Sequence, residues 1–108
     1  MIVRHTAAEP AFVLDEAENF RGFAVDAAGV DLPTLDAALQ GASVGKLGPT
    51  EGTDAAFISI DWVRAAAGEL SSSEEWLSGF DNMIAYSKNK GWITEDGTQI
   101  ISHIENAA

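Results

Sequence analysis

The chain has 108 residues, 46% of them apolar, so it is long enough for one domain with a substantial core. Seventeen acidic side chains against six basic ones give a net charge of -11, which argues against binding to nucleic acid or anionic membranes, because both depend on Lys and Arg. The absence of cysteine excludes disulfides, thiolate metal sites and cysteine nucleophiles.

Three strands are predicted in the first quarter of the chain. Residues 2–4 and 11–14 are short apolar runs. Residues 20–26 form a longer candidate that is rich in β-forming side chains and bounded by turn formers. Gly22 inside this segment indicates a bulge or the close approach of another backbone.

A helix is predicted next, over residues 32–40. Asp31 precedes it as an N-cap, Pro33 lies in the first turn, where a missing N–H costs little, and Gly41 ends it. The side chains that this helix would bury are Leu32, Leu35 and Leu39.

The middle of the chain combines irregular and apolar segments. Residues 41–54 hold four glycines and one proline, which predicts a long loop. Residues 55–60 have the length and residue types of a buried strand. Residues 61–70 then form a short helix capped by Asp61, with an extension of the strand through Arg64 as the alternative.

The clearest helix signal covers residues 73–90. Ser72 and Glu75 fit a capping box at its start, and Gly91 fits a left-handed C-cap after which Trp92 folds back on the helix end. The apolar stripe of this helix consists of Trp76, Leu77, Phe80, Met83 and Ile84.

A hairpin follows, because Asp96-Gly97 between two apolar runs is typical of a two-residue type I′ turn. Residues 98–104 form its second strand or, alternatively, a short terminal helix. Together the elements predict a single α+β domain over residues 1–108. In it a small, mostly antiparallel sheet packs against the two main helices and the chain ends in a C-terminal hairpin.

Three titratable side chains are the candidates for catalysis. Asp61 follows a buried strand beside a large ring, where a carboxylate can serve as a general acid or base. His5 and His103 would join it if the first and last strands were neighbours in the sheet. The spacing of the two histidines matches no metal-binding motif, and capping of the next helix is the simpler role for Asp61.

The candidate ligand or interface residues are the tryptophans Trp62, Trp76 and Trp92. Each ring is large and carries an N–H that needs a partner, which suits the edge of a core, a pocket or an interface. Core packing accounts for them equally well.

These observations favour an accessory module without catalytic activity, which works with a protein partner or with itself as a homodimer. No segment resembles a signal peptide or is long enough to span a membrane, so we expect a complete cytoplasmic chain. We expect no cofactor, metal, nucleic acid or membrane contact, and a small-molecule ligand is compatible with the sequence.

Two alternatives stay open. One is a small lyase, isomerase or hydrolase that uses Asp61 with His5 and His103. The other is an acidic inhibitor or immunity-type protein that blocks a basic partner with clustered acids such as Glu74, Glu75 and Asp81.

Overall fold

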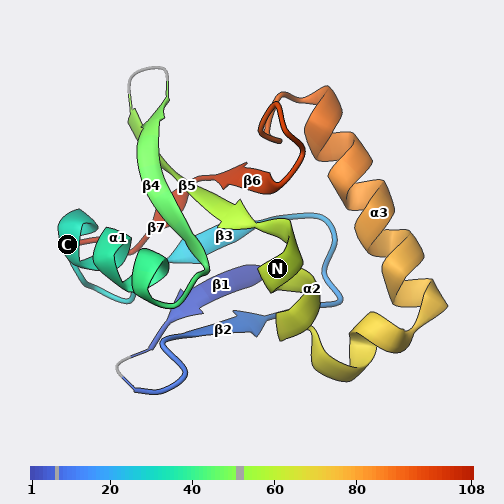
Figure 1. Ribbon diagram of the computed structural model, residues 1–108, viewed down its shortest axis with the longest axis horizontal. Coiled ribbons are helices and arrows are strands. Elements are labelled where there is room, and N and C mark those ends of the chain that lie inside the picture. The colour runs from blue at the N-terminus through green and yellow to red at the C-terminus, as the bar shows by residue number, and fades with distance from the viewer. Residues whose placement is uncertain (7, 51–52) are drawn as a thin grey trace.

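Strands and helices alternate irregularly in the computed structural model of the protein, which describes residues 1–6, 8–50 and 53–108 (Figure 1). The strands are β1 (Ile2–His5), β2 (Phe12–Asp15), β3 (Ala24–Asp26), β4 (Gly45–Thr50), β5 (Thr53–Ser59), β6 (Gln99–Ser102) and β7 (Ile104–Glu105). The helices are α1 (Leu32–Gly41), α2 (Ile60–Ala66), the 3₁₀ helix η1 (Gly68–Ser72) and α3 (Glu74–Asn89).

The strands divide between two sheets in the described part of the chain. In the four-stranded sheet, ordered β2-β1-β3-β7, β1 pairs antiparallel with β2 and parallel with β3, and β3 pairs parallel with β7. The three-stranded sheet, ordered β4-β5-β6, is antiparallel throughout. The predicted α+β class and both main helices are confirmed, with two sheets in place of the single sheet expected.

The C-terminal strand changes sheets part-way along. Residues 98–104, predicted as one strand, separate into β6, which pairs with β5, and β7, which pairs with β3. The break lies at His103, whose carbonyl accepts a hydrogen bond from the Val25 N–H (3.1 Å). This crossing ties the two sheets together.

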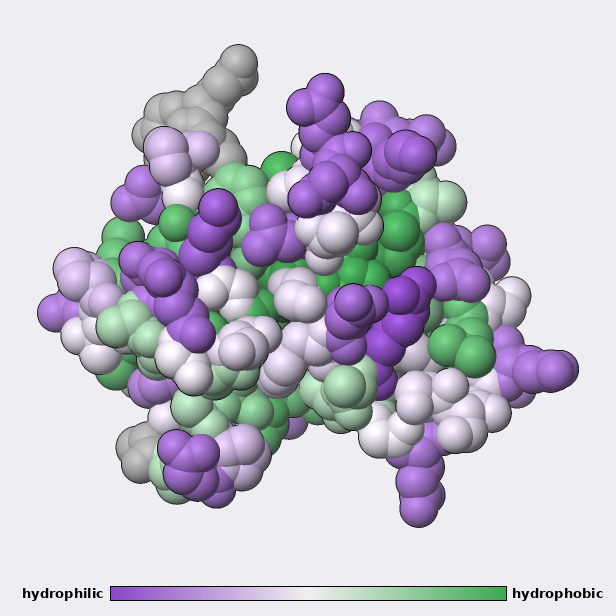
Figure 2. Space-filling model, viewed as in Figure 1, coloured by the Kyte–Doolittle hydropathy of each residue, from purple (hydrophilic) through white to green (hydrophobic). Residues whose placement is uncertain are grey.

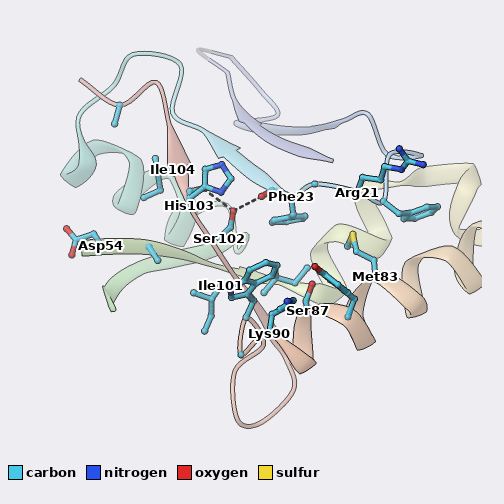
Figure 3. A pocket seen from close by; sticks show the side chains of 18 of the residues that line it. Arg21, Phe23, Asp54, Met83, Ser87, Lys90, Ile101, Ser102, His103 and Ile104 are labelled. Carbon is cyan, nitrogen blue, oxygen red and sulfur yellow. Dashed lines mark hydrogen bonds between the residues drawn. The ribbon is translucent and has the colours of Figure 1, made fainter. Parts of the chain in front are cut away.

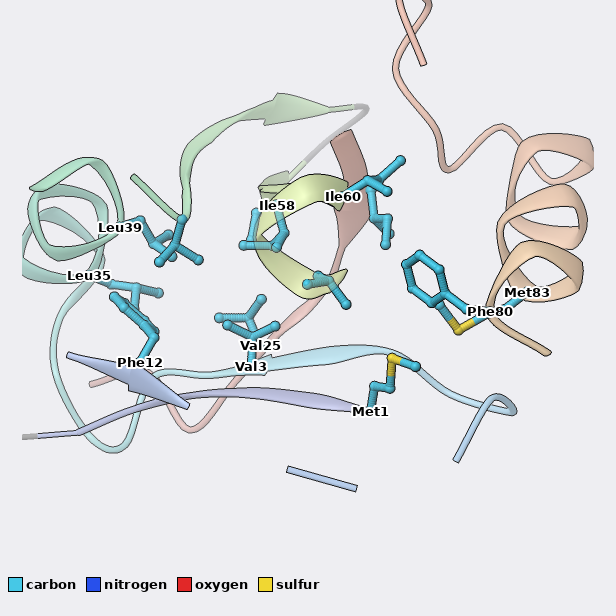
Figure 4. Packing of buried hydrophobic residues seen from close by; sticks show 14 of the residues in the cluster. Met1, Val3, Phe12, Val25, Leu35, Leu39, Ile58, Ile60, Phe80 and Met83 are labelled. Atoms are coloured by element: carbon cyan, nitrogen blue, oxygen red, sulfur yellow. The ribbon is translucent and has the colours of Figure 1, made fainter. Parts of the chain in front are cut away.

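The core fills the space between the sheets and the helices (Figure 4). Val3 and Val25 of the four-stranded sheet and Ile58 of the three-stranded sheet are fully buried. The side chains that close the two ends of the core come from α1 and α3: Leu35, Leu39, Phe80 and Met83. Each of these large apolar side chains contributes about 1.5–3 kcal/mol by leaving water.

Two predicted helix ends are confirmed. Asp31 caps α1, and its Oδ1 accepts from the Thr34 N–H (2.8 Å). At the end of α3, Gly91 adopts the left-handed region (φ 80°), and the Trp92 N–H donates back to the Ser87 carbonyl (2.9 Å). This bond folds the chain over the last turn of α3.

The N-caps of the other two helices differ from the predicted residues. Ser73, not Ser72, caps α3 and accepts from the amide three residues on (3.2 Å), because Ser72 belongs to η1. Ser59, not Asp61, caps α2 and accepts from the Trp62 N–H (3.2 Å). A helix therefore follows β5, as predicted, and the alternative of a longer strand is wrong.

The long loop predicted for residues 41–54 is wrong. β4 and β5 form an antiparallel hairpin there, and residues 51–52 lie outside the described residues. Glycine and proline are disfavoured in β-strands, but β4 accommodates both. Gly45 lies against the Phe57 carbonyl, where a Cβ would overlap the oxygen. Pro49 lies on an outer strand, which needs hydrogen-bond donors on only one side.

The strand predicted over residues 20–26 is shorter, because β3 begins only at Ala24. The preceding residues form a loop that the N-terminus holds in place. The ammonium group of Met1 donates to the Asn19 carbonyl (2.9 Å) and to the Gly22 carbonyl (2.8 Å). Gly22 therefore belongs to this loop and not to a bulge within a strand.

The C-terminal hairpin forms, but its turn is not the two-residue type I′ turn predicted. The Thr94 N–H donates to the Gln99 carbonyl (3.0 Å), which leaves four residues in the connection. A type I′ turn needs positive φ at both central residues, and only Gly97 has it (φ 76°). Asp96 instead accepts from the hydroxyls of Thr94 (2.7 Å) and Thr98 (2.8 Å).

The close approach at Gly45 leads to a test of the β4–β5 hairpin. We expect Gly45→Ala to lower the free energy of unfolding by about 2–3 kcal/mol, because the new methyl group overlaps backbone that cannot move without breaking the ladder. Gly41→Ala is the matched control, since a Cβ at Gly41 meets nothing within 4 Å. We expect it to be neutral or stabilising by up to about 1 kcal/mol. Urea denaturation measures both, and equal effects would contradict the close approach.

Candidate functional site

The side chains proposed for catalysis lie on separate parts of the fold. His5 ends β1, with its ring 5.1 Å from that of Phe12. Asp61 lies in the first turn of α2 with its side chain 97% exposed. In the register of β1, β3 and β7, His103 lies two strands and three residues from His5, about 14 Å between Cα atoms. The structure does not bring the three side chains together.

The three tryptophans occupy different environments. Trp76 belongs to the core: it stacks on Phe80 (5.0 Å between ring centroids), and its Nε1–H donates to the Ala17 carbonyl (2.7 Å). Trp62 is partly buried against the same core. Trp92 is 47% exposed, and it alone of the three lines a groove.

This groove, of about 1020 Å³, lies between α3 and the C-terminal segment (Figure 3). Residues 100–104 line one side of it, and the loop of residues 20–23 lines another. The lining residues from α3 and its C-cap include Met83, Tyr86, Ser87, Lys90 and Trp92. In the space-filling view, hydrophobic surface is visible between α3 and the strands, with hydrophilic side chains around it (Figure 2).

Contacts in its N-terminal half and beyond its C-terminal end hold α3 beside the groove. In the N-terminal half of the helix, the Phe20 ring lies against Gly79, where a Cβ would overlap it, and 6.1 Å from the Trp76 ring. Past the C-terminal end, the Ile101 N–H donates to the Trp92 carbonyl (2.7 Å). The stretch of α3 between these two attachments lies beside the groove.

Two aromatic rings are exposed at this groove. Tyr86 is 57% exposed and Trp92 is 47% exposed, and they form an edge-to-face pair with centroids 6.1 Å apart. They are the exposed large hydrophobic residues of the described part of the chain. Exposed apolar surface of this kind marks an interaction site more often than isolated surface side chains do.

The charge at the groove differs in sign from that of the whole protein. Arg21 and Lys90 line the groove, and neither has an ion-pair partner within the described residues. The Lys90 ammonium lies 5.5 Å from the centroid of the Tyr86 ring. Among the described lining residues, Asp54 is the one acid. The remaining arginines are paired, Arg64 with exposed acids at 3.5 and 3.7 Å.

Sequence reasoning identified Trp92 as a ligand or interface residue and His103 as a catalytic candidate, and both line the groove; it missed Arg21, Phe23, Tyr86 and Lys90. Tyr86 follows Met83 by one helical turn, so the stripe pattern could have revealed it. Arg21 and Phe23 reach the groove through a loop whose position depends on contacts distant in the sequence. No local pattern indicates them.

Comparison with known proteins gives no relative: no protein-family model, curated protein or solved structure matches the chain. Residues 1–6, 8–50 and 53–108 include no cluster of three or more His, Asp or Glu side chains suited to hold a metal ion. None of the helices within these residues is long and apolar enough to cross a membrane. The groove is therefore interpreted from its own chemistry.

Away from the groove, the buried carboxylate Asp26 holds a charged cluster together. Arg4 bonds to Asp26 (2.7 Å) and to the more exposed Asp15 (2.6 Å). Asp26 also accepts from the Ala28 N–H (2.8 Å) and from the Asn106 side chain (3.2 Å). The Ala28 amide, followed by Asn106, lowers the pKa of Asp26 below its ordinary value of 3.8.

We expect Asp26→Asn to lower the free energy of unfolding by about 2 kcal/mol near neutral pH, because it removes charged hydrogen bonds from a buried group. A lowered pKa stabilises the folded state above the ordinary value of 3.8, and this contribution is lost as the pH falls through the folded-state pKa. The variant should therefore approach wild type only in acid. Asp15→Asn is the matched control, with an expected loss below about 1 kcal/mol. Urea denaturation as a function of pH measures both. A difference that persists in acid would contradict the proposed titration of Asp26.

The sign of the charge at the groove can be measured by fluorescence quenching. The part of the emission that Trp92→Phe removes reports on this ring. We expect iodide to quench it more strongly than caesium, despite the net charge of -11, because the Lys90 ammonium lies 5.5 Å from the Tyr86 ring that pairs with Trp92. Lys90→Glu should reverse the order, whereas Lys46→Glu, outside this groove, should not. Stronger quenching by caesium in the wild type would contradict a cationic groove.

Proposed function

We propose that the protein is an interaction module without catalytic activity of its own, and that the groove beside α3 receives a segment of a protein partner. The observation that carries this proposal is the pair of exposed rings, Tyr86 and Trp92, at the edge of an apolar groove. Tryptophan, tyrosine and arginine are the residues that contribute most to binding at protein interfaces, and all three occur here.

The polar side chains of the groove are not arranged as a catalytic site, which favours a binding function. The Ser102 hydroxyl reaches the backbone carbonyls of Phe23 (3.4 Å) and His103 (3.0 Å), so it is engaged in holding the chain. His103 also lines the groove, with its Nε2 3.6 Å from the Glu105 carboxylate and its side chain 67% exposed. Asp61 and His5 line no part of this groove. The enzyme hypothesis therefore has no observation in its favour.

The homodimer expected from the sequence stays a prediction. A twofold dimer over this groove would place two copies of the same surface face to face, each carrying Arg21 and Lys90 against one acid, Asp54, among the described lining residues. Like charges that face each other oppose association. We therefore favour a different chain as the partner, and sedimentation equilibrium distinguishes the two.

A library of random peptides displayed on phage tests the proposal. We expect the wild-type protein to enrich peptides that bind as isolated synthetic peptides, and Trp92→Ala or Tyr86→Ala to weaken this binding at least about tenfold. Val13→Ala is the control, since Val13 is a partly buried apolar residue outside both the core cluster and the groove. Isothermal titration measures the affinities, and thermal melts verify that the variants fold. Binding that survives both groove substitutions would refute the proposal.

A further inference from the structure

The strands beside the groove already have neighbours within the protein. Trp92 lies along β6 on the side away from β5, and its carbonyl accepts from the Ile101 N–H (2.7 Å). Further along the chain, β3 occupies the same side, where the His103 carbonyl accepts from the Val25 N–H (3.1 Å). No strand can therefore be added here, and a bound segment has to make its polar contacts mainly with side chains.

The polar side chains available at the groove are mostly hydrogen-bond donors. Tyr86 and Trp92 are 57% and 47% exposed, and neither the hydroxyl nor the indole N–H has a hydrogen-bond partner among the described residues. In the same part of the chain, the charged groups of Arg21 and Lys90 have no hydrogen-bond or ion-pair partner. Indole, ammonium and guanidinium groups donate and do not accept. The groove is therefore complementary to a segment that offers carbonyl oxygens.

The two exposed rings add an apolar surface of defined shape. The planes of Tyr86 and Trp92 are inclined at 66° with their centroids 6.1 Å apart, so the rings form a corner. Phe23 and Met83 contribute further apolar side chains to the lining (Figure 3). A compact and rigid group binds such a corner at lower cost than a long flexible side chain, because it loses less conformational entropy.

Proline meets both requirements at once. Each proline carries a carbonyl but no N–H, so contact with a groove of donors leaves no donor of its own unpaired. Its ring is compact, and a run of prolines forms a polyproline II helix before binding, in which no carbonyl is hydrogen-bonded internally. An α-helix, in contrast, uses its carbonyls internally, and the net charge of -11 repels a segment that offers carboxylates.

We infer, on the basis of the proposed function, that the partner contributes a proline-rich segment in the polyproline II conformation. A proline ring packs into the corner between Tyr86 and Trp92, whose hydroxyl and indole N–H donate to carbonyls of the segment. Arg21 and Lys90 donate to further carbonyls. Recognition of this kind uses an aromatic-lined groove and needs no free strand edge, in agreement with the groove described above.

Titration with L-decaproline, followed by NMR, tests this inference. We expect the peptide at millimolar concentration to shift the indole N–H signal of Trp92, which Trp92→Phe identifies by its loss. The signal of Trp62 should stay in place, since Trp62 does not line the groove. The control is D-decaproline, which has the same composition but the opposite helix hand, and which we expect not to bind.

Substitutions that remove one donor and keep a ring test the hydrogen bonds. We expect Tyr86→Phe and Trp92→Phe each to weaken the binding of L-decaproline about three- to tenfold, which corresponds to the loss of one hydrogen bond. Trp62→Phe makes the same change outside the groove and is the matched control, with an expected effect below about twofold. Isothermal titration measures the affinities, and thermal melts verify that the variants fold.

The outcomes separate the two proposals. Equal binding of the two enantiomers, an unmoved Trp92 signal, or equal effects of Trp62→Phe and Trp92→Phe would overturn the proline-rich segment. If peptides from the phage library still required Trp92, the interaction module would stand. No peptide binding that depends on Trp92 would overturn both. A dimer in sedimentation that Trp92→Ala dissociates would identify a second copy as the occupant and overturn the proline-rich partner.

Discussion

Residues 99–105 pair with β5 in one sheet and with β3 in the other, so a single stretch of backbone joins the two sheets. The groove depends on this crossing, because the residues that change sheets also line one side of it. Their position relative to α3 is set by two hydrogen bonds of Trp92, one to the end of the helix and one from Ile101. The same backbone contacts thus stabilise the fold and define the candidate site.

The position of α3 illustrates how a fold leaves a surface open. Its first half is buried through Trp76 and Phe80, whereas Tyr86 and Trp92 near its end remain exposed. The Phe20 ring against Gly79 anchors the N-terminal half of the helix, and the left-handed C-cap at Gly91 returns the chain to the sheet. Exposed rings held by such rigid elements bind with little loss of conformational entropy, which suits an interaction surface.

Charge acts at two distances in this protein. The excess of acidic side chains sets the field that a distant molecule experiences, and salt screens that field within about 10 Å. Arg21 and Lys90 line the groove, and the field of these two charges is felt only at short range. The net charge therefore predicts which charged molecules the whole protein repels, but it does not give the local charge of one groove.

The local structure was largely predictable from the sequence. The α+β class, both main helices, the Asp31 cap and the Gly91 C-cap follow from interactions between residues fewer than six apart, and such interactions are visible in the order of the residues. The same reasoning failed for β4, where glycine and proline predict a loop. Only the neighbouring strand makes Gly45 and Pro49 suitable there.

The candidate site was the least predictable feature. Trp92 was identified because a tryptophan is conspicuous in any sequence, but Arg21 and Phe23 belong to a loop that Met1 holds across about twenty residues of chain. The sequence by itself determined the two main helices, the caps at Asp31 and Gly91, and the sign of the net charge. Tertiary structure alone decided the division into two sheets and the groove, because strand pairing and the packing of α3 join residues far apart in the chain, whose encounter no local pattern specifies.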